Sequence, residues 1–444
     1  MRCLLAAAAL ALAGLAAAAE PVAFVHVNVL TMQPGQAPQL DRTVLVRDGR
    51  IEAIGVELPM PGDVRRIDAT GRWLSPGLAD MHVHSDTAED LAVYLSYGVT
   101  TVLNMGGARN RFVLRTMPAA NRGAIPAPQV FAAFVVDGTA DYGHFQVRTP
   151  EQARAVVGLA KANGYRFIKV YNNLAADVFQ ALADEGRRQG LPLVGHSVTK
   201  VGLAAQLDAG QVAIAHLEEF LYAFFWPPGT EQTDAPPPDS AIPAAVELMR
   251  RHPGAAVMAD PVTYAAIAGQ IGHPEVVARY LAAPEVATLA PADRLAWRQS
   301  GYVNKSAKLQ ARQAFLGRFA QALAEAGVLL LSGTDAPTIP GLFPGVALLD
   351  NLDLLVQAGL TREQALATAT RQPGDFMQAQ GGGTPFGRIE VGARADLLLT
   401  QANPVDDLGT LRRPLGVMGG GQWRDAAALA ALRADVARRY EQAR

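Results

Sequence analysis

Cysteine is almost missing from this chain of 444 residues, and the single example is Cys3. Residues 1–19 have the features of a secretory signal, because Arg2 provides a positive start, an apolar stretch follows, and three alanines precede Glu20. Removal of this segment would take Cys3 with it. We therefore expect an exported protein, periplasmic or secreted, without disulfides or thiolate metal ligands. A retained anchor is the alternative interpretation of the same segment.

Long hydrophobic runs and an excess of charge of one sign are missing as well. The apolar leader is too short to cross a bilayer, so we expect no stable membrane insertion once it is removed. The 39 basic and 41 acidic residues nearly balance, with a formal net charge of −2, which argues against a nucleic-acid partner. Half of the residues are apolar, enough for a large barrel with a smaller satellite domain.

Short β-rich segments alternate with alanine-rich helical stretches through the middle of the chain. This alternation predicts repeated βα units and a parallel sheet. The predicted strands lie at residues 78–84, 100–104, 129–136, 167–171, 191–196, 212–216, 256–260 and 328–333. Eight such units make an α/β fold of the TIM-like (β/α)8 barrel type, whose catalytic groups lie at the carboxyl ends of the strands.

Both ends of the chain carry β patterns of another kind. Alternating runs flank Asp48-Gly49, a strong hairpin-turn signal, and a similar pattern returns at residues 387–399. We expect one small β-sandwich built from residues 20–74 and 381–425, with the barrel between them at residues 75–380. Residues 426–444 are predicted to form a C-terminal helix that packs on the barrel or on another subunit of a homo-oligomer.

Metal-ligand side chains fall at the ends of the predicted strands. His82 and His84 are one residue apart on the first strand, and alternate side chains of a strand share one face. Later strands end in His196, His216 and Asp335. Each of these residues alone has an ordinary structural explanation, such as a helix cap for the aspartate. Their combination at the ends of the first, fifth, sixth and eighth predicted strands is specific for a metal site.

Lys169 lies inside the apolar strand at residues 167–171. Burial of a lysine lowers its pKa and makes the neutral amine available. Such an amine can take up carbon dioxide to become a carbamate, an anionic ligand with two oxygens that can bridge two metals. A lysine whose ammonium reaches out at the strand end is the alternative.

This set of residues resembles the metal-ligand pattern of the amidohydrolase superfamily, and most of all its exported imidazolonepropionase-like and lysine-bridged prolidase-like members. The resemblance extends from the Gly49-Arg50-Ile51 hairpin to residues 387–396. It implies six ligands: His82, His84 and Asp335 for one metal, His196 and His216 for the other, and a carboxylated Lys169 as the bridge. The expected cofactors are two divalent ions, and imidazole and carboxylate ligands suit zinc best.

The activity implied by this resemblance is hydrolysis of a C–N amide bond by a hydroxide that bridges the two metals. Asp335 is expected to move the proton from this hydroxide to the departing amine. The substrate would be a dipeptide, as in prolidases or carboxypeptidases, or an N-acyl amino acid. A lactonase, an esterase or an organophosphate hydrolase is the alternative, since the same hydroxide attacks esters. A cyclic-amide hydrolase and an inactive metal-binding protein are further alternatives.

Substrate-binding candidates follow the strands in loops. Tyr142 and His144 come after the third strand, and His144 is a candidate catalytic group that orients the scissile carbonyl, or a ligand of a substrate carboxylate. Tyr222 lies where similar enzymes use a tyrosine to contact the substrate's carboxylate, and Arg109 is a further cationic candidate. The aromatic-rich loop at residues 224–243 is expected either to admit apolar substrate groups or to pack its own aromatics at the surface.

Overall fold

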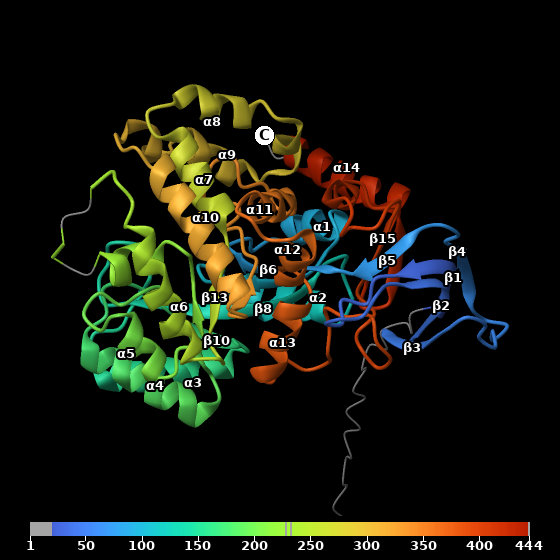
Figure 1. Ribbon diagram of the computed structural model, residues 1–444, viewed down its shortest axis with the longest axis horizontal. Coiled ribbons are helices and arrows are strands. Elements are labelled where there is room, and N and C mark those ends of the chain that lie inside the picture. Colours follow the sequence, from blue (N-terminus) through green and yellow to red (C-terminus); the bar gives the residue numbers. More distant parts are fainter. Residues whose placement is uncertain (1–19, 227–228, 231–232, 443–444) are drawn as a thin grey trace, which may run out of the picture.

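The computed structural model describes residues 20–226, 229–230 and 233–442, which form a barrel with a β-sheet part at its side (Figure 1). The predicted signal at residues 1–19 lies outside the described residues, and export stays a prediction. No helix in the described ranges combines the length and the apolar character needed to cross a membrane.

Eight parallel strands of the described chain form the barrel. They are β6 (Leu78–Val83), β7 (Val99–Asn104), β8 (Gln129–Asp137), β10 (Phe167–Val170), β11 (Leu193–Gly195), β12 (Ala213–Ile214), β13 (Ala256–Met258) and β14 (Leu329–Leu331), and the short β9 (Phe145–Gln146) pairs with β8. The ring closes between β14 and β6, because the Met81 N–H donates to the Ser332 carbonyl and the Asp335 N–H to the His82 carbonyl, each at 2.8 Å. The predicted (β/α)8 barrel is confirmed.

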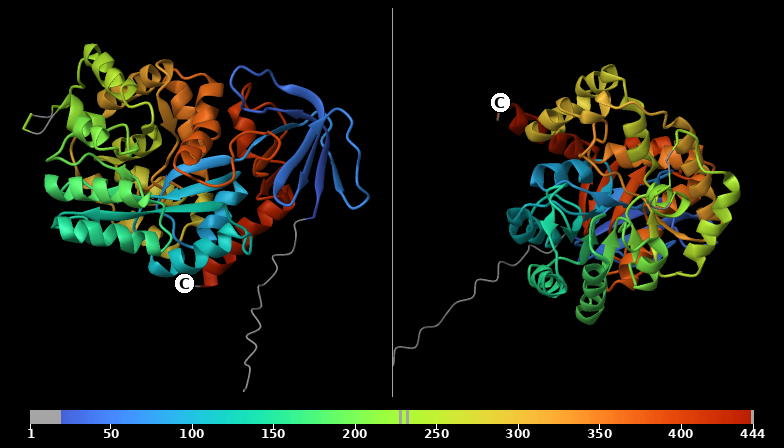
Figure 2. Two further views of the ribbon diagram at one scale, coloured as in Figure 1. Left: turned by 90° about the horizontal axis from the view of Figure 1, so that it is seen from below. Right: turned by 90° about the vertical axis from the view of Figure 1, so that its left-hand side faces the viewer.

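Helices surround these strands in both views of Figure 2. They are α1 (Ala88–Ser96), α2 (Met117–Asn121), α3 (Pro150–Ala162), α4 (Ala176–Gln189), α5 (Leu203–Asp208), α6 (Ile242–Arg250), α7 (Pro261–Gln270), α8 (Pro274–Leu281), α9 (Pro291–Arg298), α10 (Gln310–Glu325), α11 (Val346–Gln357), α12 (Arg362–Thr368) and α13 (Arg371–Ala379). Local sequence sets several of their starts. At α12, for example, Thr361 and Gln364 form a reciprocal capping box.

The terminal segments share one sheet, in the order β17-β16-β15-β5-β1-β2-β3, with β4 beside β1. Its strands are β1 (Val22–Val29), β2 (Gln39–Arg47), β3 (Arg50–Gly55), β4 (Arg65–Asp68), β5 (Trp73–Pro76), β15 (Leu397–Thr400), β16 (Gly416–Gly419) and β17 (Gln422–Asp425). Antiparallel pairing of β5 with β15 joins the two ends of the chain. The predicted hairpin turn is present, with φ angles of 50° at Asp48 and 75° at Gly49.

This sheet folds back on itself as a sandwich does. The rings of Phe24 on β1 and Trp423 on β17 lie 5.0 Å apart, although β5, β15 and β16 separate these strands in the sheet. Neighbouring strands are about 4.8 Å apart, so the two rings could not meet across a flat sheet. The predicted β-sandwich built from both termini is therefore confirmed.

The C-terminal helix α14 (Ala426–Gln442) lies against α1 of the barrel (Figure 1). Val436 and Tyr440 pack there with Ala92 and Val93 in one buried cluster. Of the two expected positions for this helix, the structure shows the one on the barrel.

Candidate active site

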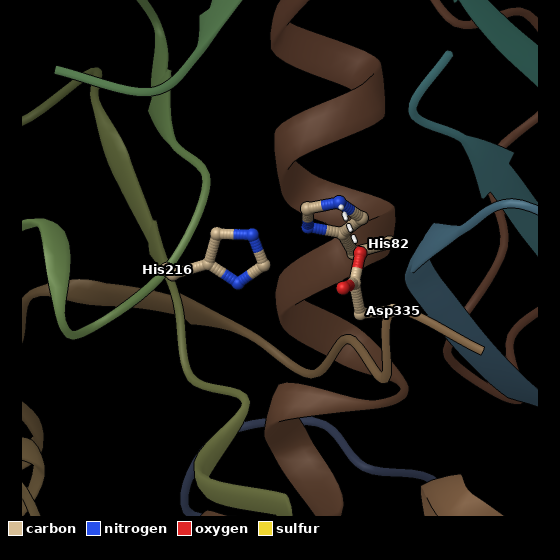
Figure 3. Close-up of side chains that lie close together, drawn as sticks. All are labelled: His82, His216 and Asp335. Carbon is tan, nitrogen blue, oxygen red and sulfur yellow. Dashed lines mark ion pairs between the residues drawn. The ribbon is translucent and has the colours of Figure 1, made fainter. Parts of the chain in front are cut away.

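The ligand candidates meet at the carboxyl ends of the barrel strands. His82 belongs to β6 and Lys169 to β10. His84 and His196 directly follow β6 and β11, His216 lies two residues after β12, and Asp335 lies in the turn after β14. Parallel strands present their carboxyl ends at the same rim of a barrel, which is why residues so distant in sequence converge. Figure 3 shows His82, His216 and Asp335 facing one another.

The distances within this group are those of a shared site. The Asp335 Oδ1 atom lies 3.2 Å from His82 Nε2 and 3.0 Å from His84 Nε2. Lys169 Nζ lies 3.1 Å from His82 Nε2. Ligand atoms of His82, His216 and Asp335 all lie within 4.8 Å of one another, and this group could hold a metal ion.

His82 and His84 are oriented through their Nδ1 atoms by backbone carbonyls. The Nδ1 of His82 lies 3.1 Å from the Ala215 carbonyl oxygen, and that of His84 lies 2.9 Å from the Gly106 carbonyl oxygen. A ring that donates from Nδ1 keeps an unprotonated Nε2, which is the form that binds metals. Both rings therefore present Nε2 to Asp335.

Two buried carboxylates orient the other histidine pair. Glu219 Oε1 accepts a hydrogen bond from His196 Nδ1 at 2.6 Å, and Asp260 accepts one from His216 Nδ1. Carboxylate–imidazole pairs of this kind fix the ring and increase the basicity of a metal-binding histidine. The site thus offers four imidazoles, each oriented by a hydrogen bond at Nδ1, and the Asp335 carboxylate. These ligand types fit divalent cations such as zinc.

Sequence reasoning gave no role to either of these carboxylates. Asp260 ends the predicted seventh strand and Glu219 follows the sixth, so their place at strand ends was the signal that could have found them. Tyr171, also missed, stacks its ring 4.1 Å from that of His196.

Burial sets the ionisation of the group. It lowers the pKa of Lys169 to about 8. It also lowers the pKa of His196 to about 4, although the negative charge of Glu219 acts to raise that pKa. Burial raises the pKa of Asp335, but hydrogen bonds from His82 and His84 outweigh this and hold the pKa well below its usual value. An accessible amine, a neutral imidazole and an ionised carboxylate are the forms that metal binding requires.

Gly333 allows β14 to approach His82 closely. A Cβ atom at Gly333 would lie 2.6 Å from the His82 Cβ and 3.3 Å from its backbone nitrogen. We expect Gly333→Ala to displace His82, to weaken zinc binding and to destabilise the protein by about 1–3 kcal/mol, as overpacking does.

Zinc titration and urea unfolding measure these effects. Gly301→Ala is the matched control, because an added Cβ there has no atom within 4 Å. Equal zinc affinity and stability in the two variants would contradict the proposed role of the close approach.

A cavity of about 460 Å³ opens beside the ligand candidates. Its wall includes His196, His216 and Asp335, and also Tyr142, Tyr171, Tyr222 and Tyr302. The structure thus places Tyr142 and Tyr222 at the site, as expected of substrate-binding residues. Their role in binding stays a prediction.

His144 and Arg109 are not among the described residues that line this cavity. The His144 ring lies 4.5 Å from the ring of Tyr171, a lining residue, and burial lowers the pKa of His144. The Arg109 guanidinium donates to both carboxylate oxygens of Asp86 at 2.7 Å. The His144 ring therefore packs against a residue of the cavity wall without lining the cavity. The Arg109 guanidinium is already paired with Asp86.

The aromatics that begin the 224–243 loop pack on α10. The Phe225 ring lies 5.0 Å from Phe315 and 5.4 Å from Phe319, and the Trp226 ring lies 4.7 Å from the Arg312 guanidinium. The aromatics at the start of the loop thus pack on the barrel core and not only on one another, and the admission of apolar substrate groups stays a prediction. Residues 227–228 and 231–232 lie outside the described part.

No family model matches the chain. A curated deacetylase of Brucella anthropi is 33% identical over 96 residues, which cover 20% of this chain and 24% of the deacetylase. A dihydroorotase of Anaeromyxobacter dehalogenans is 26% identical over 147 residues, 33% of this chain and 31% of the relative. The chain thus spans less than a third of the length of these two relatives. An imidazolonepropionase of Acidiphilium cryptum is 25% identical over 401 residues, 85% of this chain and 91% of the relative.

Solved structures match over nearly the whole chain. Bottromycin amidohydrolase superposes with a TM-score of 0.73 at 25% identity, covering 94% of this chain and 91% of that one. A Xaa-Pro dipeptidase with methionine bound in its active site shares the fold, with a TM-score of 0.65 at 17% identity, covering 91% and 100%. In its barrel, its two-ended β-sandwich and its sequence, the chain is thus similar to amidohydrolases.

Proposed function

We propose that this protein is a binuclear metal-dependent amidohydrolase that cleaves a C–N amide bond in dipeptides or N-acyl amino acids, with zinc as the metal. The observation that carries the proposal is the convergence of four imidazoles, Asp335 and a buried lysine at one rim of the barrel. A plain structural role would not need four neighbouring histidines with their Nδ1 atoms engaged, two of which have Nε2 within 3.2 Å of Asp335.

In this proposal, His82, His84 and Asp335 hold one cation, His196 and His216 hold the other, and Lys169 bridges them as a carbamate. Cations bound there would supply Lewis acidity, which lowers the pKa of water and polarises the scissile carbonyl. The short distance of 3.1 Å between Lys169 Nζ and His82 Nε2 supports the place of the lysine among the ligands.

Asp335 is the group that moves protons. The imidazoles of His82 and His84 beside it keep the pKa of its carboxyl low, and it lines the cavity where the substrate would lie. It accepts a proton from the attacking water and returns it to the amine that leaves. The names of the relatives, a deacetylase, an amidohydrolase and a Xaa-Pro dipeptidase, support an amide as the substrate.

The test is amine release by zinc-loaded protein lacking residues 1–19, from a panel of dipeptides and N-acyl amino acids. We expect activity on part of this panel and its loss in Lys169→Ala. If the wild type binds two zinc ions but releases amine from no compound of the panel, the result would contradict amide hydrolysis and favour lactones or esters as substrates.

A further inference from the structure

Glu218 is a carboxylic acid at the cavity wall without a visible partner. It follows His216 by two positions, it is 8% exposed, and it lines the cavity beside the ligand candidates. Among the described residues, no other side chain donates a hydrogen bond to its carboxylate, and His216 is the charge that acts on it most strongly. Its neighbour Glu219, in contrast, accepts hydrogen bonds from His196 and from the Ser197 N–H.

A buried carboxylate without a partner costs free energy, so such a group is unusual unless a ligand completes it. One candidate ligand is a metal ion, since Glu218 lies with His216 and Asp260 in a group whose ligand atoms are within 4.8 Å of one another. Asp260 accepts the Nδ1–H of His216 with one oxygen, and its Oδ1 has no partner among the described residues. The second candidate is a cationic group of the substrate, and the zinc content of a Glu218 variant separates the two.

The charges of the wall agree with a cationic ligand. Carboxylates of Glu218, Glu219 and Asp335 face the cavity, whereas the described lining residues include neither lysine nor arginine. Arg109 is paired with Asp86. A substrate carboxylate would therefore meet no guanidinium or ammonium in this wall.

Two further cations lie near the wall without being part of it. Arg312 donates to the Thr233 carbonyl at 3.1 Å and packs on Trp226. Lys305 is exposed, and its ammonium lies 4.8 Å from the centre of the Tyr302 ring. Lys305 is the cation that could bind a substrate carboxylate in place of an amine bound at Glu218. Lys305→Met removes this cation.

Tyrosine rings complete the environment. Tyr142, Tyr171, Tyr222 and Tyr302 all line the cavity. The faces of aromatic rings attract ammonium groups, and more strongly where water is excluded. A desolvated carboxylate surrounded by tyrosines is a suitable binding site for a protonated amine.

We infer that the substrate presents a protonated amine to Glu218, and that this amine, and not a carboxylate, is the charged group by which the cavity recognises it. The inference rests on the proposed function, which it narrows to amides that carry a free amino group, such as peptides with an unblocked amino terminus. Glu218 is thus assigned as a specificity-determining residue.

A binding experiment tests the inference without turnover. 2-Phenylethylamine and the neutral 2-phenylethanol are titrated into the zinc-loaded protein by calorimetry. We expect the amine to bind about 10- to 100-fold more tightly, as for a hydrogen bond to a charged group, and Glu218→Gln to abolish this preference. Lys305→Met should retain the preference. Equal binding of the two compounds to the wild type, or an unchanged preference in Glu218→Gln, would overturn the inference.

Kinetics give the second measurement. Glycyl-L-phenylalaninamide carries an ammonium alone and N-acetylglycyl-L-phenylalanine a carboxylate alone. We expect a higher kcat/KM for the first, and a loss of about 10- to 100-fold for that substrate alone in Glu218→Gln, mainly through KM. A preference for the carboxylate compound that Lys305→Met removes would overturn the inference in favour of Lys305.

Zinc content distinguishes substrate binding from metal binding. Glu218→Gln should keep the zinc stoichiometry and melting temperature of the wild type, and loss of a zinc ion would instead identify Glu218 as a metal ligand and overturn the assignment. If the amine binds as expected but no amide is hydrolysed, the proposed function fails and the binding assignment stands.

Discussion

Asp335→Asn should retain its zinc and lose about 10²- to 10⁴-fold in kcat, the usual loss when a positioned acid–base group is removed. The Asp335 Oδ1 lies 3.2 Å from His82 Nε2 and 3.0 Å from His84 Nε2, and Asp335 also lines the cavity, so one side chain contacts both the ligand candidates and the space for the substrate. An amide oxygen can still bind a cation, but an amide cannot accept the proton of the attacking water.

Asparagine is also the replacement that suits the backbone at this position. Asp335 has a φ of 59°, in the left-handed region, and asparagine and aspartate adopt it more readily than most residues. The fold at the end of β14 should therefore be preserved, and the variant isolates the effect of the proton-accepting group.

The measurement is kcat on the best substrate of the amide panel, together with metal analysis of the same protein sample. Asp335→Ala is the comparison, because it removes the oxygen ligand as well and should lose metal in addition to activity. Full turnover in Asp335→Asn would contradict the assignment of Asp335 as the proton carrier.

Lys169→Arg should bind one zinc ion in place of two and lose at least about 10²-fold in kcat. Lys169 is 2% exposed, and its Nζ lies 3.1 Å from His82 Nε2, so a permanent cation there would repel the metals. A guanidinium keeps the positive charge and forms no carbamate. Removal of a side chain that orients a metal ligand usually costs about 10- to 100-fold in activity, and a group that would hold both metals should cost at least as much.

Carbon-13 NMR of protein equilibrated with labelled bicarbonate and zinc tests the carbamate directly. A carbamate signal should appear in the wild type and be absent from Lys169→Arg. Lys161→Arg is the matched control, because the Lys161 amine donates to the Gln189 carbonyl at an exposed position far along α3. Two zinc ions in Lys169→Arg, or a wild type without the signal, would contradict the bridging lysine.

The convergence of the ligand candidates could be predicted from the sequence because its signals are local. Strand period places His82 and His84 on one face, and the alternation of β and α segments places Lys169 on the fourth strand of a barrel and Asp335 after the eighth. Because connections between parallel strands are right-handed and short, few other arrangements of βα units are possible. The carboxyl ends of the strands therefore meet at one rim of the barrel. The two-ended sandwich followed in the same way from β patterns at residues 39–55 and 387–399.

Only the tertiary structure decided which groups complete the site, since loops of different βα units meet according to packing rather than sequence distance. It paired His196 with Glu219 and His216 with Asp260, and it bound Arg109 to Asp86. It also turned Phe225 onto α10. The sequence by itself determined the barrel and the common rim at which the ligand candidates meet, because periodicity and residue type are local. The charge of the cavity was decided by tertiary contacts, because it depends on which charged side chains are already paired.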